Sequence, residues 1–164
     1  MGNRMTPEMK SVIDELNTTV TTVAAKLSFM PDAEFEAKPN PTKWSKKEVL
    51  GHLIDSAHSN LRRFVVGQYE TTPPHIIYDQ DFWVAANDYP NESGENLVTL
   101  WRLLNNRITA ILSTMPIEKY SHRCNTGKGE ASLRTLDWLA ADYVKHMKHH
   151  VNQILPGSYA ITYP

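Results

Sequence analysis

Three histidines lie within five positions near the end of the chain, in the segment VKHMKHHVNQIL at residues 144–155. A helix turns about 100° per residue, so His146 and His150 lie on the same inward side, whereas His149 points in the polar direction. Two imidazoles one helical turn apart can bind one metal ion, and the segment therefore predicts part of a metal site. The alternative is a chance spacing on a solvated helix surface, in a chain with seven histidines.

A third ligand must come from another part of the chain. In the helix expected at residues 46–69, a line of polar side chains beside the apolar stripe begins with His52. It predicts a pocket wall in which Ser56, Asn60 and Arg63 hold a polar substrate. Plain helix surface or hydrogen bonds between helices would give the same pattern. Asp55 could orient an imidazole, but its helical angle favours a position in solvent.

Other residues with reactive side chains fit the site less well. His58 and Arg62 point outward from the same helix, while His75 and His122 fall in expected loops, where a turn or an exposed role is expected. Cys124, the single cysteine, lies in the expected loop YSHRCNTGKGEAS. No base can be placed beside it, so we do not expect it to act as a nucleophile.

The donor set narrows the kind of metal. Di-iron bundles with bridging carboxylates use Glu-x-x-His motifs, and this sequence has none. Three neutral imidazoles suit one divalent ion, with zinc or nickel first and iron, manganese or copper as alternatives. Structural zinc is normally held by four protein ligands. A set of three histidines with an open position therefore favours catalysis.

Four amphipathic helices are predicted to position these residues. Hydrophobic spacing and capping residues place them at residues 7–30, 46–69, 94–115 and about 133–155. Pro31 and Pro116 end the first and the third, and Ser45 with Glu48 forms a capping box at the start of the second. No segment shows sustained strand alternation. The prediction is an all-α four-helix bundle in one domain, residues 1–164.

One connection is much longer than the others. Residues 70–93 can cross the end of the bundle, and their aromatic side chains could cover a pocket. Tyr78, Asp79, Asp81 and Trp83 are candidates to line or cover the site. Ordinary loop packing and helix capping are the alternatives.

The composition excludes several classes of partner. The 17 basic and 18 acidic residues nearly cancel and form no long run, so no nucleic acid or anionic membrane surface is predicted as a partner. No apolar stretch approaches the roughly 20 residues of a membrane span. The N-terminus lacks the apolar core of a signal peptide, and a single cysteine cannot form an internal disulfide. We expect a cytoplasmic protein.

Three segments in the same chain resemble a known family. WSKKEVLGHLIDSAHSNLRRF, IIYDQDFW and DYVKHMKHHVNQI, in this order between Trp44 and Ile154, are similar to the DinB/YfiT-like metalloproteins. That family includes thiol-dependent S-transferases such as the bacillithiol transferases. The resemblance implies an up-down-down-up four-helix bundle, whose crossover is residues 70–93, and a homodimer.

The resemblance also implies a ligand set and an activity. In the family one histidine of the second helix and two of the last hold the metal, and these match His52, His146 and His150. The implied enzyme activates a small-molecule thiol, which attacks an electrophilic co-substrate. The reacting group would be a thiol or water rather than a side chain, so hydrolysis of an ester or amide stays open. A non-catalytic metal-binding stress-response bundle is the third possibility.

Overall fold

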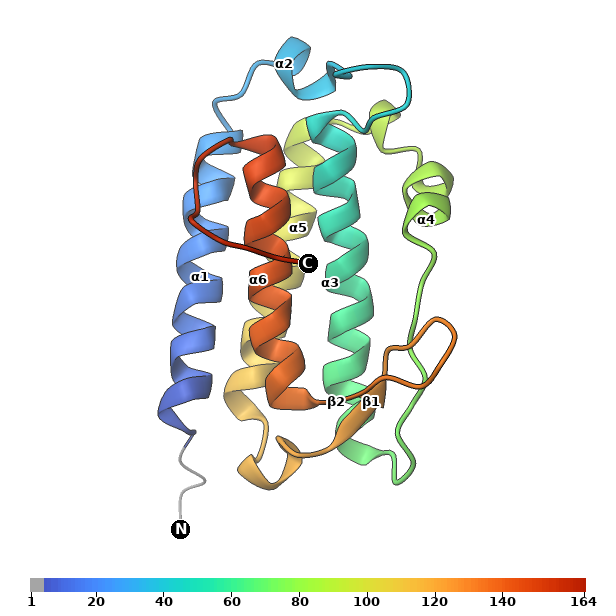
Figure 1. Ribbon diagram of the computed structural model, residues 1–164. Helices are drawn as coiled ribbons and strands as arrows, with labels where there is room; N and C mark the ends of the chain where they lie inside the picture. The colour runs from blue at the N-terminus through green and yellow to red at the C-terminus, as the bar shows by residue number, and fades with distance from the viewer. Residues whose placement is uncertain (1–4) are drawn as a thin grey trace.

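Four long helices form a bundle in the computed structural model, which describes residues 5–164. They are α1 (Pro7–Leu27), α3 (Lys46–Tyr69), α5 (Gly94–Thr114) and α6 (Leu136–Ile154). In Figure 1, α1 and α6 run upward whereas α3 and α5 run downward, which confirms the predicted up-down-down-up bundle. Residues 1–4 lie outside the described residues. The prediction about a signal peptide falls partly on them.

Side chains that satisfy free backbone N–H groups fix the start of three long helices. The Thr6 hydroxyl accepts a hydrogen bond from the N–H of Met9 at 3.2 Å and begins α1. The predicted capping box at α3 is present, because Ser45 and Glu48 each accept the backbone N–H of the other. The Ser93 hydroxyl caps α5. Since the first N–H groups of a helix have no partner inside it, these caps set where each helix begins.

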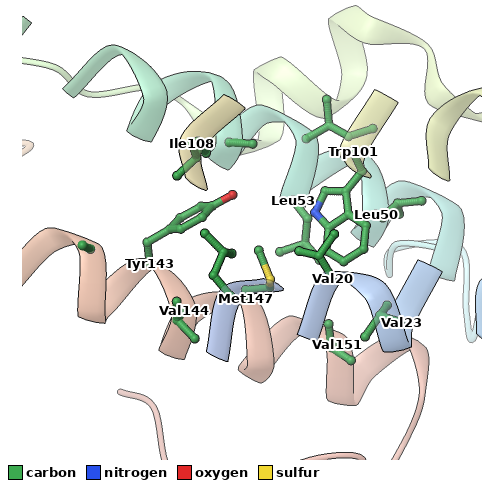
Figure 2. Packing of buried hydrophobic residues seen from close by; sticks show 14 of the residues in the cluster. Val20, Val23, Leu50, Leu53, Trp101, Ile108, Tyr143, Val144, Met147 and Val151 are labelled. Carbon is green, nitrogen blue, oxygen red and sulfur yellow. The ribbon is translucent and has the colours of Figure 1, made fainter. Parts of the chain in front are cut away.

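The core lies between the four helices. Helix α3 packs against α5 and α6, and α1 packs against the same two helices. Figure 2 shows side chains from all four meeting around Trp101, which is fully buried. Burial of these apolar stripes is the main favourable term in folding. The hydroxyl of buried Tyr143 donates to Asn105 Oδ1 at 2.7 Å, so this polar group keeps a partner inside the core.

The long connection after α3 has more structure than the sequence indicated. It contains α4 (Gln80–Asn87) and the short 3-10 helix η1 (Tyr89–Asn91), and it climbs along the outside of α3 before α5 begins (Figure 1). Because it returns to the end of the bundle where α3 started, α3 and α5 run parallel. The connection is thus the predicted crossover. Its two short helices were not predicted.

A small hairpin corrects the predicted start of the last helix. Strand β1 (Arg123–Asn125) pairs antiparallel with β2 (Leu133–Thr135). Residues 133–135 are therefore extended, and α6 begins at Leu136 rather than near Leu133. Cys124, which we expected in a loop, lies in β1. The hairpin also holds the crossover, since the backbone of Asn125 bonds to Pro74 and Ile76.

The other connections also contain short helices. The link between α1 and α3 contains α2 (Asp32–Glu36), and the link after α5 contains the 3-10 helix η2 (Ile117–Lys119). Helix α1 ends at Leu27, three residues before the predicted end, and a turn leads to Pro31. Among residues 5–164, no helix is both long enough and apolar enough to cross a membrane.

Candidate metal centre

Three histidines meet where α3 and α6 pack side by side. His52 of α3 and His146 and His150 of α6 each offer a ring nitrogen, and the three nitrogens lie within 4.8 Å of one another. The Nε2 atoms of His52 and His146 are 3.2 Å apart. His52 is fully buried, and the other two are half-buried. The predicted set therefore converges in space, with two donors from one helix and the third from its neighbour.

Neighbouring side chains fix the orientation of the two rings on α6. His150 Nδ1 lies 2.9 Å from Gln153 Oε1, which is a hydrogen-bond acceptor, so Nδ1 carries the ring proton. Nε2 therefore keeps its lone pair and can bind a metal ion. The Ser56 hydroxyl lies 3.4 Å from His146 Nδ1. Contacts of this kind set the tautomer and the ring orientation of histidines that bind metals.

The surroundings keep the three rings neutral, which is the form that binds metal ions. Burial, together with the charges of His150 and Lys128, lowers the pKa of His52 to about 3. Burial and the other histidines lower the pKa of His146 to about 2. Burial also lowers the pKa of His150. Three unprotonated nitrogen donors at this spacing could hold a divalent ion.

Asp55 is buried rather than exposed, so its predicted position in solvent was wrong. The crossover covers this side of α3, and the Tyr89 hydroxyl donates to Asp55 Oδ1 at 2.5 Å. Burial raises the pKa of Asp55 to about 6. Within residues 5–164, Asp55 Oδ2 and His52 Nδ1 are both buried and lack a hydrogen-bond partner. The other possibility, a hydrogen bond from an imidazole to Asp55, is not among the hydrogen bonds of the described residues.

Gly51 allows the crossover to pack at this point, because the Tyr89 ring lies directly against its Cα. A Cβ at position 51 would overlap that ring. We expect Gly51→Ala to displace Tyr89 from Asp55 and to lower the free energy of unfolding by about 1–3 kcal/mol, as overpacking usually does. Denaturant unfolding measures this change.

Gly129→Ala is the matched control for that substitution. An added Cβ there meets nothing within 4 Å, so we expect a change within about 0.5 kcal/mol. Equal stability of the Gly51→Ala and Gly129→Ala variants would contradict the close packing of Tyr89 on α3.

The candidates on α3 follow the predicted line but are not solvated surface. Ser56 and Asn60 are buried, and Asn60 Nδ2 donates to the carbonyl oxygen and the hydroxyl of Ser56 at 2.9 and 3.3 Å. The Asn60 bonds lie within α3, whereas the contact of the Ser56 hydroxyl with His146 joins α3 to α6. Arg63 is half-buried and donates to the carbonyl of Ile76 in the crossover. The polar line thus faces the inside of the protein.

The candidates in the crossover fall into two groups. The Tyr78 ring is half-buried, with its centroid 6.4 Å from that of His52 and 6.3 Å from that of Trp83. Asp79 instead caps α4 by accepting the N–H of Phe82 at 3.1 Å, and both Asp79 and Asp81 are exposed. Tyr78 therefore lies beside the centre with Trp83 behind it, while Asp79 has a capping role.

The residues judged less suited to metal binding lie outside the cluster. His58 and Arg62 are exposed, as predicted. His75 and His122 contact the backbone carbonyls of Gly127 and Gly67, at 2.7 and 2.9 Å. Cys124 is fully buried, and burial raises the pKa of its thiol, both of which oppose a nucleophilic role.

Several residues beside the centre were not predicted as part of it. Trp44 lies with its ring centroid 5.2 Å from that of His52. The C-terminal segment turns back across α6 (Figure 1) and brings the Tyr163 ring to 5.7 Å from His146, while its hydroxyl donates to Asp142 at 3.0 Å. Of the neighbours of the three histidines, only Gln153 could have been predicted from the sequence, because residues three apart on a helix lie side by side and Gln153 follows His150 by three.

A groove of about 720 Å³ includes two residues that contact the histidines, although none of the three histidines is among its lining residues. Trp44 and Gln153 form part of its wall, and these residues contact His52 and His150. Residues from the α2–α3 link and from the start of α4 complete it.

Known proteins are similar to this chain in sequence and share its bundle. The metal-dependent hydrolase candidate YfiT of Bacillus subtilis (strain 168) is 26% identical over 125 residues, which cover 76% of this chain and 70% of that protein. The solved structure of YfiT, described as a probable metal-dependent hydrolase with an unusual four-helix bundle topology, has a TM-score of 0.82 at 22% identity. It covers 94% of this chain and 89% of its own.

A second solved structure has the same bundle inside a longer protein. The mycothiol-dependent maleylpyruvate isomerase has a TM-score of 0.68 at 14% identity and covers 96% of this chain, but only 65% of its own chain. The sequence model of the DinB superfamily matches residues 13–154. This span contains all three histidines of the cluster and most of the bundle, and the chain belongs to the DinB superfamily.

Proposed function

We propose that this chain is a metal-dependent enzyme in which His52, His146 and His150 hold one divalent ion, and that it transfers a small-molecule thiol to a small electrophile. One observation carries the proposal, the convergence of three neutral ring nitrogens within 4.8 Å of one another. Zinc or nickel fits this donor set best, with iron, manganese or copper as alternatives.

The chain's own residues supply orientation rather than a reacting group. Gln153 and Ser56 hold the rings of His150 and His146, and Tyr78 and Trp44 shield His52 from water. A divalent ion, when bound, supplies Lewis acidity that favours the ionised form of a thiol or of water. The site therefore needs no protein nucleophile, which agrees with the burial of Cys124.

The transfer itself is a simple displacement. The thiol gives up its proton to solvent, and its sulfur forms a bond to the electrophilic carbon. The bond from that carbon to the leaving group then breaks, and the leaving group departs with the electron pair. A thiol-dependent reaction is also named for one protein with this bundle, the mycothiol-dependent isomerase.

Hydrolysis is the second candidate function. YfiT, which is 26% identical to this chain, is named as a metal-dependent hydrolase candidate. The same Lewis acidity would serve water as readily as a thiol. A non-catalytic stress-response bundle fits less well. A structural zinc site normally has four protein ligands, and within the described residues the cluster has three. The predicted homodimer stays a prediction.

Metal analysis followed by two parallel assays tests the proposal. Untagged protein should contain one divalent ion per chain. It should accelerate the reaction of cellular thiols with a fluorogenic electrophile such as monobromobimane, and a chelator should abolish this activity. The second assay measures hydrolysis of p-nitrophenyl acetate without thiol. If metal-loaded protein cleaves the ester but conjugates no thiol, the proposed transferase activity is wrong and hydrolysis takes its place.

A further inference from the structure

Arg63 uses only part of its hydrogen-bonding capacity. Its Nε and Nη2 atoms donate to the carbonyl oxygen of Ile76, at 3.1 and 2.7 Å, and Nη1 lies 3.4 Å from Asn60 Oδ1. A guanidinium carries five N–H donors. Two of them therefore lack an acceptor among residues 5–164, although the side chain is half-buried.

The positive charge of Arg63 also lacks an ion pair. Five ion pairs occur in the described part of the chain, and Arg63 takes part in none of them. Asp142 is close enough for its charge to act on Arg63, but its carboxylate accepts the Tyr163 hydroxyl instead. A partly desolvated cation without an anion is costly, so the site suits an incoming anion.

Arg63 lies on the side of α3 that faces the histidines. A chain of contacts joins it to the cluster, because Asn60, which Arg63 contacts, donates to the Ser56 hydroxyl at 3.3 Å, and this hydroxyl lies 3.4 Å from His146 Nδ1. A second cation, Lys128 of the β1–β2 hairpin, acts on His52. Two positive charges near a site that is itself suited to a metal cation favour anionic ligands.

We infer that a substrate handled at the histidine centre carries a carboxylate, which pairs with the two free N–H groups of Arg63. The planar guanidinium can hold both oxygens of a carboxylate with two parallel hydrogen bonds. The inference rests on the proposed function, because it assumes that the reacting part of the substrate lies at the three histidines. To that proposed function it adds the chemical class of the substrate, a carboxylic acid.

A purely structural role is the competing explanation for Arg63. Its bonds to Ile76 anchor the crossover to α3, so a substitution could loosen the whole site. Loosening would weaken the binding of acidic and neutral ligands alike. Only a role in recognition changes the ratio between an acid and its neutral amide, and this ratio is therefore the quantity to measure.

The first experiment measures that ratio for thiols. Protein loaded with Co²⁺ is titrated with mercapto acids of increasing chain length and with the matching mercapto amides, and binding is followed by the sulfur-to-cobalt absorption band. We expect one chain length at which the acid binds about ten-fold or more tightly than the amide, as a charge-assisted bidentate pair allows. Arg63→Gln should remove the preference, and Arg63→Lys should restore part of it. The exposed neighbour Arg62→Gln is the control.

The second experiment does not need the metal. Calorimetry on metal-free protein compares glutarate with glutaramide, again in the wild type and in Arg63→Gln. If glutarate binds more tightly than glutaramide but no mercapto acid binds more tightly than its amide, the carboxylate belongs to the electrophile rather than to the thiol. If no thiol gives an absorption band, the proposed thiol chemistry fails while the glutarate result still tests Arg63. Equal binding of acid and amide in both experiments, or a preference that survives Arg63→Gln, would overturn the inference.

Discussion

Replacing His146 by alanine is expected to weaken the binding of Zn²⁺ or Ni²⁺ by at least about two orders of magnitude. Loss of a residue that merely orients a ligand already costs about 10–100-fold in affinity, and His146 would supply one of three donors itself. Its Nε2 atom lies 3.2 Å from that of His52, so the two nitrogens are placed to share one ion. Competition with a chromophoric chelator measures the affinity.

His58→Ala is the matched control for this substitution. His58 lies on α3, like His52, but its side chain is exposed and outside the cluster. We expect no change in metal affinity for His58→Ala. If His58→Ala and His146→Ala weakened binding equally, or if neither did, the ion would have to bind elsewhere, and the proposed centre would be wrong.

Acid is expected to destabilise the metal-free protein strongly. Both His52 and His146 have an ordinary pKa of 6.5, which burial lowers to about 3 and about 2 in the folded state. Between these limits the unfolded chain binds more protons than the folded chain, so the free energy of unfolding decreases as the pH falls below 6.5. Each ring accounts for a loss of about 2 kcal/mol by about pH 5.

Asp55 acts in the opposite direction. Burial raises its pKa to about 6, so the folded protein takes up this proton at a higher pH than the unfolded chain does. This uptake adds about 1 kcal/mol to the free energy of unfolding by about pH 5. The net loss of about 3 kcal/mol is a large part of the stability of an ordinary domain. Denaturant unfolding at a series of pH values measures it.

A variant and a bound metal both check the cause. His146→Gln removes one of the two titrating rings, so the loss by about pH 5 should shrink by about 2 kcal/mol. Saturating metal should raise the free energy of unfolding by a similar amount at each pH in this range and leave the loss itself unchanged, because the folded-state rings are already unprotonated above about pH 3. An unchanged pH dependence in His146→Gln would show that other groups control the acid sensitivity.

Local chemistry in the sequence determined where the long helices are. Their apolar residues recur every three to four positions, and the caps at Thr6, Ser45 and Ser93 mark where three of them begin. The same periodicity placed His146 and His150 on one side of the last helix, since residues four apart share a face. These features depend only on neighbours along one helix, so no tertiary information is needed to find them.

Extended pairing between distant residues could not be found in this way. Leu133 continues the apolar pattern of α6 backward, yet its backbone pairs with Asn125, and the helix starts three residues later. A three-residue strand is too short to show alternation. Its stability comes from the partner strand and from the crossover that lies against it.

The surroundings of the metal centre were decided by tertiary structure. A helical angle placed Asp55 in solvent, but the crossover covers it through Tyr89, since Gly51 leaves room for that ring. Tyr163 reaches His146 only because the chain turns back after α6. The sequence by itself determined the helices and the inward pair His146 and His150, and the family resemblance added His52. Which side chains surround them depended on how non-helical segments fold over the bundle, and periodicity holds no information about that.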